Sequence, residues 1–445
     1  MLNKLPKKAW VITVDMGYGH QRASYPLRFL AKGKVISANN YPGIPESDKG
    51  FWVNGRSFYE FISRFKKVPI IGERAFDLFD RLQAIPAFYP KRDLSKPNLQ
   101  LKEVYKLLEN NNWGRHLMIK LAKENLPLVT TFFITAMMAE YYNYPGEIYC
   151  VICDADISRT WAPLNPHCSR INYLAPCKRV VERLKLYGVR PNKIFLTGFP
   201  LPAENVGENL NILKQDLGKR LINLDPDKIY ISQYRKTLLS FLGRDLKMTP
   251  TRPLTITFVV GGAGAQRELG ATIIGGLKKE ILAGKVRINL VAGIHLEINK
   301  YFKEAIRVHR LSKKLNQGIE IIFSPNKMDY FKKFNQALRT TDILWTKPSE
   351  LSFYCGLGLP IIMAPPIGSQ EIFNQRWLQS IGAGINQDDP RYANEWLSDW
   401  LKSGWLAEAA MQGYMEAPKY GTYNIEKVVF EKPEEAKAVQ TVLQY

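Results

Sequence analysis

The sequence predicts an α/β protein built from two Rossmann-like, doubly wound domains that face each other across a cleft. The chain has 445 residues. That is more than one hydrophobic core usually organises, so two domains of roughly 200 residues each are expected. Residues 8–14 form a short apolar run that ends in a glycine-rich turn, and residues 254–260 repeat this pattern. A helical pattern follows each turn, as in the first unit of a parallel sheet.

The two patterns of strand, glycine turn and helix mark the starts of the two domains and so determine the predicted domain boundaries. Residues 1–205 form the N-terminal Rossmann-like domain and residues 251–402 form the C-terminal one. Residues 206–250 are polar and are expected to be a weakly structured linker or insertion. Residues 403–445 form a tail that we expect to pack back on the N-terminal domain. Residues 129–134 and 148–153 are apolar and are predicted to be buried strands.

Composition and charge narrow the class of protein. Hydrophobic residues make up 46% of the chain and charged residues 23%, which is the balance of a folded globular protein and excludes a disordered or fibrous one. The net charge of +21 favours phosphate-bearing ligands, either nucleotides or anionic lipid headgroups, although a general basic bias is the alternative. The charge is dispersed without long runs, so no nucleic-acid partner is expected.

The termini and cysteines predict a reduced, cytoplasmic setting. The apolar stretch behind the basic residues 1–8 is too short for a signal peptide, and the apolar segment near residues 130–139 is too short to span a bilayer. Five cysteines without a secretion signal indicate reduced thiols. Cys150 and Cys153 have the spacing of half a zinc site, but in a strand their side chains diverge, so no metal site is predicted.

Two glycine turns carry the first candidate site residues. In the second turn the backbone N–H groups of a helix N-terminus suit a diphosphate, and the residues concerned are Gly261, Gly262, Gly264 and Ala265. The spacing matches neither a P-loop nor a dinucleotide fingerprint, so a tight turn without a ligand is the alternative. In the first turn, His20 follows Gly17 and Gly19 at the edge where such sheets bind ligands. An imidazole there suits removal of a proton from an attacking hydroxyl, and the alternative is a structural histidine that caps the turn.

A third region combines polar groups with helix starts. Ser349 and Glu350 are expected at the start of a helix, where a carboxylate can hold the vicinal hydroxyls of a ribose. Gln370 and Glu371 open another helix, with Asn374 one turn further on, and they offer groups that bind sugar hydroxyls. For Glu350 the alternative is an ordinary helix-start carboxylate favoured by the helix dipole.

The order of these motifs resembles glycosyltransferase family 28, which contains the monogalactosyldiacylglycerol synthases and the N-acetylglucosaminyltransferase that completes the peptidoglycan lipid precursor. The resemblance covers most of the chain in short islands. Those islands are residues 17–24, residues 151–156 with Trp161 and Pro163, residues 187–200, residues 261–266 and residues 358–374.

The resemblance implies a GT-B fold and inverting transfer of a sugar from a nucleotide diphosphate-sugar, a UDP-sugar, to a hydroxyl acceptor, with no cofactor or metal. His20 would be the catalytic base, helped by Asp154. The acceptor-side residues would be Gly17, Gly19, Arg22 and Trp161. The donor-binding residues would be Gly261, Gly262, Gly264, Ala265, Ser349, Glu350, Gln370, Glu371 and Asn374. Asp154 and Asp156 match a metal-binding Asp-x-Asp pattern, but we interpret them as a pair at the end of a strand.

Two departures from the family pattern stand out. The family's ribose-binding glutamate lies seven residues before the proline of the Leu-Pro pair, and here that position is Phe353. Glu350 lies ten residues before Pro360 and takes the role only if the loop is remodelled. Gln21 is inserted between His20 and Arg22.

The sequence leaves several acceptors as alternatives. The aromatic and basic segment 51–89 suggests a lipid acceptor and a peripheral position on the inner face of an anionic membrane, while a cleft-lining hairpin is the alternative for that segment. A soluble glycan or a polyprenyl-linked sugar are the other acceptors. Two further alternatives for function are a nucleotide-sugar epimerase on the same plan and a non-catalytic protein that binds a nucleotide or lipid.

Overall fold

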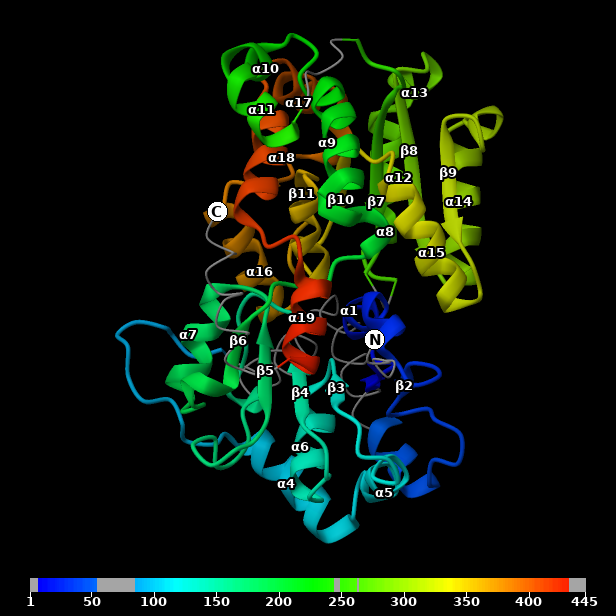
Figure 1. Ribbon diagram of the computed structural model, residues 1–445. Coiled ribbons are helices and arrows are strands. Elements are labelled where there is room, and N and C mark those ends of the chain that lie inside the picture. Colours follow the sequence, from blue (N-terminus) through cyan, green and yellow to red (C-terminus); the bar gives the residue numbers. More distant parts are fainter. Residues whose placement is uncertain (1–6, 54–84, 244–248, 262–263, 432–445) are drawn as a thin grey trace, which may run out of the picture. The chain divides into compact units, whose positions relative to one another are not determined.

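The computed structural model describes residues 7–53, 85–243, 249–261 and 264–431, and it divides into two compact units. The first unit comprises residues 1–201, 367–373 and 420–445, and the second comprises residues 202–366 and 374–419. The aromatic segment 51–89 lies largely outside the described residues, as do Gly262 and Ala263. Each unit contains one six-stranded parallel sheet with helices packed against it, which confirms the predicted fold class of two Rossmann-like units (Figure 1).

The sheet of the first unit has the strand order β2-β1-β3-β4-β5-β6, with every pair parallel. In that order the strands are β2 (Ile36–Ser37), β1 (Trp10–Thr13), β3 (Leu128–Thr130), β4 (Ile148–Val151), β5 (Asn172–Ala175) and β6 (Ile194–Leu196). The helices are α1 (Gly19–Ser24), α4 (Leu99–Asn111), α5 (Arg115–Leu121), α6 (Phe133–Tyr141), α7 (Lys178–Leu186) and α19 (Gly421–Phe430), with short 3₁₀ turns η1 (Pro26–Leu30), η2 (Arg159–Trp161) and η3 (Pro191–Lys193).

The core of the first unit joins its sheet to the end of the chain. Ile425 and Val429 of α19 pack with Val129 and Val151 of the central strands, and η1 packs against the same cluster. Figure 1 shows α19 lying against these strands. The side-chain amide of Asn424 also donates to the carbonyl of Thr197, just beyond β6, at 2.9 Å. Residues 420–431 are therefore an integral layer of this unit.

The sheet of the second unit has the order β12-β11-β10-β7-β8-β9, again entirely parallel. In that order the strands are β12 (Gly384–Asn386), β11 (Ile361–Met363), β10 (Ile343–Thr346), β7 (Leu254–Val259), β8 (Val286–Gly293) and β9 (Ile319–Phe323). Counted from β7 within this unit, the order from the β9 edge is 3-2-1-4-5-6, the arrangement of dinucleotide-binding sheets. Strands β8 and β9 are added on one side of β7, and β10, β11 and β12 are added on its other side. The point where the strand order reverses, the reversal point of this sheet, therefore lies between β7 and β10.

The helices of the second unit surround this sheet and a helical extension. They are α8 (Ala203–Val206), α9 (Asn211–Leu224), α10 (Ile229–Gln233), α11 (Arg235–Leu242), α12 (Arg267–Gly276), α13 (Lys278–Leu282), α14 (Leu296–Val308), α15 (Lys327–Leu338), α17 (Ala393–Lys402) and α18 (Trp405–Glu416), and α16 (Ser369–Ser380) contributes its later part. Short 3₁₀ segments are η4 (Glu208–Leu210), η5 (Ser312–Lys314), η6 (Glu350–Leu357) and η7 (Pro390–Tyr392).

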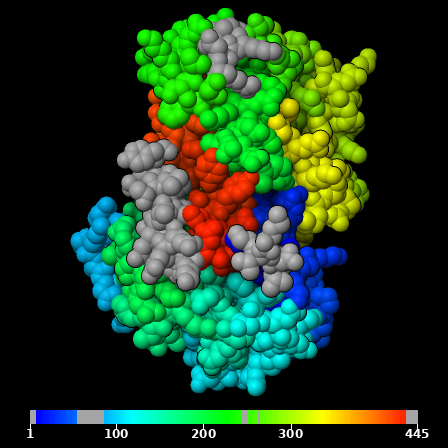
Figure 2. All heavy atoms as spheres, in the orientation of Figure 1, coloured from blue at the N-terminus to red at the C-terminus, as the bar shows by residue number. Residues whose placement is uncertain are grey.

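Residues 206–243 differ from the weakly structured linker that was expected over residues 206–250. They form α9, α10 and α11, and α9 and α18 pack side by side (Figures 1 and 2). Leu213, Leu217 and Leu221 recur every four residues and are buried, so a helical face binds this stretch to the second unit. The buried Arg220 fixes it further, because its guanidinium donates to the carbonyls of Thr341 at 2.7 Å and Leu357 at 2.8 Å.

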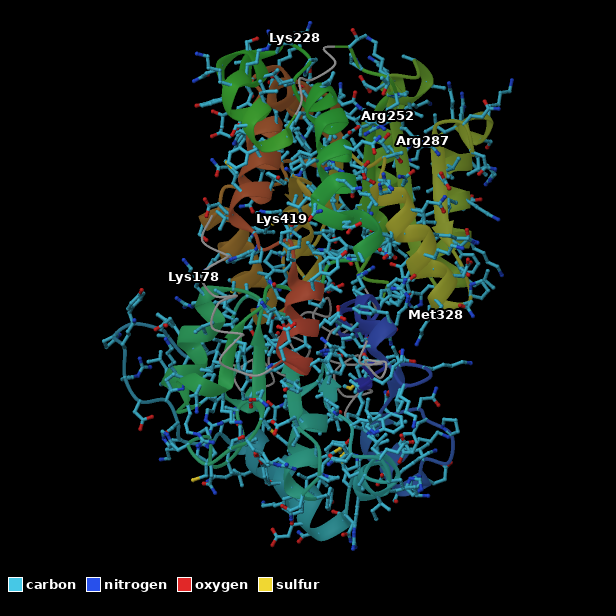
Figure 3. The ribbon with its side chains drawn as sticks, viewed as in Figure 1. Lys178, Lys228, Arg252, Arg287, Met328 and Lys419 are labelled. Atoms are coloured by element: carbon cyan, nitrogen blue, oxygen red, sulfur yellow. The ribbon has the colours of Figure 1, made fainter. Side chains whose placement is uncertain are left out.

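Two half-buried cations of the second unit have hydrogen-bond partners within it. Arg252, which is labelled in Figure 3, lies two residues before β7 and donates to both carboxylate oxygens of the buried Asp342 at 2.6 Å. Lys419 is the last residue of this unit, and its Nζ donates to the carbonyl of Tyr414 at 2.6 Å (Figure 3). Burial lowers the pKa of Lys419 to about 8. The Arg252 pair joins segments that are 90 residues apart in the sequence, whereas the Lys419 bond is local.

The predicted strand 129–134 is corrected in part. Strand β3 ends at Thr130 and helix α6 begins at Phe133. The reason is that α6 is buried almost all round, from Phe133 to Ala139, so its sequence lacks the polar face that distinguishes a helix from a buried strand. None of the described helices is both long enough and apolar enough to cross a bilayer.

Candidate functional site

The predicted site residues of the first unit gather where its strand order reverses. Strand β1 lies between β2 and β3, and ligands of such sheets bind beyond the carboxyl ends of the strands at this point. Gly17 has φ +90°, a backbone conformation that only glycine adopts without strain, and helix α1 begins two residues later. The turn therefore brings His20, in the first turn of α1, to this edge of the sheet.

A hydrogen bond across the reversal point orients His20. Its Nδ1 lies 2.6 Å from the carbonyl oxygen of Thr131, which directly follows β3. A carbonyl only accepts, so Nδ1 carries the hydrogen and Nε2 is the nitrogen with the lone pair in the neutral ring. The side-chain hydroxyl of Thr131 donates to that of Thr13 at 3.2 Å, which ties β3 to β1. The tautomer suits a general base that acts through Nε2.

Aromatic rings enclose the half-buried His20. The ring of Phe132 meets it edge-on at a centroid distance of 4.8 Å, and Trp161 lies at 6.3 Å. The structure thus brings together His20 and Trp161, two residues that the sequence analysis placed in the same site. Thr131 and Phe132, which hold and cover the imidazole, were not singled out from the sequence.

Other predicted acceptor-side residues have mainly structural surroundings. Arg22 is 4% exposed, and its guanidinium lies 5.1 Å from the ring centre of Tyr18, so it packs the glycine turn against α1. Asp154 lies half-buried on the loop after β4, next to Cys153. The Cys153 thiol points toward the carbonyl of Thr131 at 3.8 Å, the same carbonyl that His20 contacts, so this loop borders the histidine.

Asp156 belongs to a buried ion pair. Arg183 donates through Nε to one carboxylate oxygen at 2.8 Å and through Nη2 to the other at 2.9 Å, and Arg179 adds a third bond at 2.8 Å. The side chains of Asp156 and Arg183 are 1% and 0% exposed. These contacts support the interpretation of residues 154–156 as a strand end. Within the described parts of the chain no group of three or more His, Cys, Asp or Glu side chains is placed to hold a metal.

The predicted site residues of the second unit also lie where its sheet reverses. Gly261 follows β7, and Ser349 and Glu350 follow β10, the neighbouring strand. Gly264 has φ +74°, so a side chain there would strain the backbone, and its Cβ, 2.7 Å from Cδ1 of Ile298, would also displace that side chain. Helix α12 begins after Gln266, whose side chain donates to the carbonyl of Pro365 at 2.9 Å. This bond ties the turn to the loop after β11.

The backbone of the glycine turn is partly used within the turn. The N–H of Gly261 donates to the carbonyl of Ala265 at 3.4 Å, and the N–H of Gly264 donates to the carbonyl of Gly261 at 2.8 Å. Gly262 lies outside the described residues. The side chain of Lys347 packs against Gly261, a contact that sequence reasoning missed. Its sequence signal was its position directly after the buried strand β10.

The segment after β10 is a 3₁₀ helix and not the α-helix that the sequence predicted. Glu350 to Leu357 form the 3₁₀ segment η6, and Glu350 is 8% exposed at its first position. Phe353, where the family pattern has a glutamate, is 2% exposed and packs on the ring of Trp377 at a centroid distance of 4.8 Å. The position of that glutamate is therefore part of the hydrophobic core.

The remaining donor-side residues open helix α16, as predicted. Glu371 accepts a hydrogen bond from the backbone N–H of Ile367 at 2.7 Å, so it shapes the loop before the helix, and Gln370 precedes it. Asn374 has no exposed surface, and its amide donates to the carbonyl of Pro348 at 3.3 Å. The side chain of Asn374 thereby connects α16 to the loop after β10.

The fold places the chain among proteins built from two Rossmann-like units, and predicted site residues lie at the reversal point of each sheet. Comparison with curated proteins then confirms the predicted resemblance. The chain is 22% identical over 388 residues to the processive diacylglycerol beta-glucosyltransferase of Bacillus pumilus, covering 85% of this chain and 82% of that protein. The enzyme of the same name from Bacillus licheniformis is 21% identical over 392 residues, with the same coverage.

The chain was also compared with protein-family models and with solved structures. Residues 242–431 match a family model described as a domain of unknown function, DUF6938. Among solved structures, the UDP-GlcNAc 2-epimerase of Neisseria meningitidis bound to UDP-GlcNAc aligns with a TM-score of 0.41 at 12% identity, covering 84% of this chain and 88% of that one. MurG of Acinetobacter baumannii aligns with a TM-score of 0.39 at 13% identity, covering 73% and 80%.

Proposed function

We propose that the chain is an inverting glycosyltransferase that moves a sugar from a UDP-sugar to a hydroxyl group of a membrane lipid. The observation that carries this proposal is the similarity to two diacylglycerol glucosyltransferases, which extends over 85% of the chain and so takes in both units. The arrangement of side chains at the two reversal points supports the same conclusion. A lipid acceptor would place the protein peripherally on the inner face of a membrane.

In the proposed mechanism His20 is the general base. Its Nδ1–H stays bonded to the carbonyl of Thr131 while Nε2 takes the proton of the acceptor hydroxyl. The hydroxyl oxygen then attacks the anomeric carbon of the donor sugar, and the bond from that carbon to the diphosphate oxygen breaks with its electron pair. UDP leaves, and the configuration at the anomeric carbon is inverted. Asp154, on the bordering loop, would stabilise the imidazolium that forms.

The donor would occupy the reversal point of the second sheet. The turn at Gly261, Gly264 and Ala265 would take the diphosphate next to the start of α12. Ser349 and Glu350 would contact the ribose, and Gln370 and Glu371 the sugar. Asn374 would act indirectly, because it is buried and holds the loop at Pro348.

One observation favours a second candidate function. The family's ribose-binding glutamate is replaced by the core residue Phe353, which packs on Trp377. A protein that binds a nucleotide-sugar or lipid without catalysis would tolerate this change. The epimerase alternative has no comparable observation in its favour.

A transfer assay separates these functions. The full chain is incubated with UDP-glucose, or in turn with UDP-galactose or UDP-GlcNAc, and vesicles that contain diacylglycerol and an anionic phospholipid. Release of UDP together with a new glycolipid by mass spectrometry is the expected result. Conversion of the nucleotide-sugar without a glycolipid would indicate an epimerase, and binding without turnover would indicate the non-catalytic function.

The variant His20→Asn tests the role of the base. Transfer should fall by about 10²- to 10⁴-fold, the usual contribution of general base catalysis, while the affinity for UDP stays within about twofold of wild type. His309→Asn is the matched control, since His309 lies at the end of α14 in the second unit, away from the glycine turn. Full activity of His20→Asn would exclude His20 as the base.

A further inference from the structure

A lysine lies at the reversal point of the second sheet, beside the turn expected to hold the diphosphate. Strands β7 and β10 are hydrogen-bonded neighbours, with Val259 paired to Thr346. Lys347 directly follows β10, and Gly261 follows β7 by two residues. Ligands of sheets with this strand order bind in the crevice between the loops that follow these two strands. Lys347 thus supplies a cation to the part of the unit best placed for a ligand.

The side chain of Lys347 lies over the α-carbon of Gly261. A Cβ added to Gly261 would lie 2.8 Å from Cε of Lys347 and 3.5 Å from its Nζ. Gly261 is not among the glycines with positive φ, so its backbone conformation does not demand glycine. The position of the lysine favours glycine instead, because a side chain at residue 261 would shift the end of Lys347, and with it the ammonium group.

Hydrogen bonds within the turn explain why an added cation would help to bind an anion there. The N–H groups of Gly261 and Gly264 donate within the turn, so their donation to an external anion is limited. A diphosphate leaving group develops negative charge as its bond to the sugar breaks, and a fixed ammonium in a half-buried site stabilises it more than water does. Lys347 is half-buried, as this role requires.

We infer that Lys347 binds the diphosphate of the donor and stabilises it as it leaves. This inference rests on the proposed function, and it adds a residue that the sequence analysis did not assign. Gly261 contributes to the same binding site, since its lack of a side chain lets the lysine side chain cross the turn.

Binding measurements on the full chain test the inference. Isothermal titration with UDP, UMP, uridine and pyrophosphate compares wild type with Lys347→Gln and Lys347→Arg. Lys347→Gln should weaken UDP binding by about 10- to 100-fold, as expected for loss of a charge-assisted hydrogen bond, and leave uridine binding within about twofold. Lys347→Arg should retain most of the affinity. Lys332→Gln, an exposed lysine on α15, is the control and should bind like wild type.

A double-mutant cycle adds a test of the contact itself. If Gly261→Ala acts by displacing the lysine, it should weaken UDP binding in the wild-type background and have little further effect in Lys347→Gln. Additive effects of the two changes would overturn the proposed link. Melting temperatures of all variants show whether each still folds.

The outcomes separate this inference from the proposed function. If Lys347→Gln binds UDP as tightly as wild type, the role of Lys347 is wrong while the donor site stands. If wild type binds pyrophosphate but neither UDP nor uridine, the UDP-sugar donor is wrong, and the loss of pyrophosphate binding in Lys347→Gln still supports the lysine. If wild type binds none of these ligands, both proposals fail.

Discussion

Replacement of Asp156 by asparagine tests whether the Asp-x-Asp motif is structural. The carboxylate of Asp156 accepts two hydrogen bonds from Arg183 and one from Arg179, all between 2.8 and 2.9 Å. Asparagine has nearly the same shape but no charge, so the guanidinium of Arg183 would stay buried without its counter-ion. Breaking a buried pair in this way costs about 3–5 kcal/mol. Most of that cost comes from Arg183, because the side chain of Arg179 is 33% exposed and is screened by solvent.

The free energy of unfolding is measured by urea denaturation, together with the melting temperature. At about 2–4 °C per kcal/mol for a unit of this size, the expected fall in melting temperature is about 6–20 °C. Glu182→Gln is the matched control, since the pair between Glu182 and Lys185 on the same helix is about equally short but exposed, and it should lose less than about 1 kcal/mol. An Asp156→Asn protein as stable as this control would refute the reasoning, and a selective loss of transfer at full stability would point to a functional role.

Three further predictions concern the second unit. Arg220→Met should lower the free energy of unfolding by about 3 kcal/mol in urea denaturation, because the buried carbonyl of Leu357 and its neighbours lose their donor; a loss below 1 kcal/mol would contradict this. Gly264→Ala should weaken UDP binding and lower the melting temperature, and Ile298→Val should restore part of both by removing the methyl group that a new Cβ would meet; no rescue would argue against the clash. The folded-state pKa of Lys419 is about 8, below its ordinary value of 10.5, so between these values the unfolded chain binds the extra proton. The stability of wild type relative to Lys419→Met should therefore rise as the pH increases from 8 toward 10, and urea denaturation at several pH values that shows no rise would contradict it.

The sequence was sufficient to predict the parts of the fold that depend on local patterns. The two apolar runs with glycine turns predicted β1 and β7 and the helices behind them, since Gly17 and Gly264 are needed for the backbone of those turns. The helices of residues 206–243 were missed because the stretch is rich in polar residues, some of which, such as Asp216 and Arg220, are buried instead of exposed. The four-residue recurrence of Leu213, Leu217 and Leu221 was the available signal.

From the sequence, only those candidate site residues could be predicted that lie within the two glycine turns or in short local motifs. His20 and Gly261 were found because each lies in a recognisable glycine turn. Thr131 and Lys347 were missed because their importance depends on strand order: each follows the strand that lies beside β1 or β7 in space but far away in sequence. Local propensity contains no information about which strands become neighbours, so the partner side of each reversal point needed the structure.

Binding of UDP to the full chain tests the central claim most directly. The melting temperature is measured with UDP, ADP, GDP and uridine, and with UDP-glucose, UDP-galactose and UDP-GlcNAc, each over a range of concentrations. A rise that is selective for UDP and its sugars, and that is smaller in Lys347→Gln, is the predicted result. No change with any nucleotide would contradict the account, because a donor site at the reversal point of the second sheet must bind the diphosphate that leaves it.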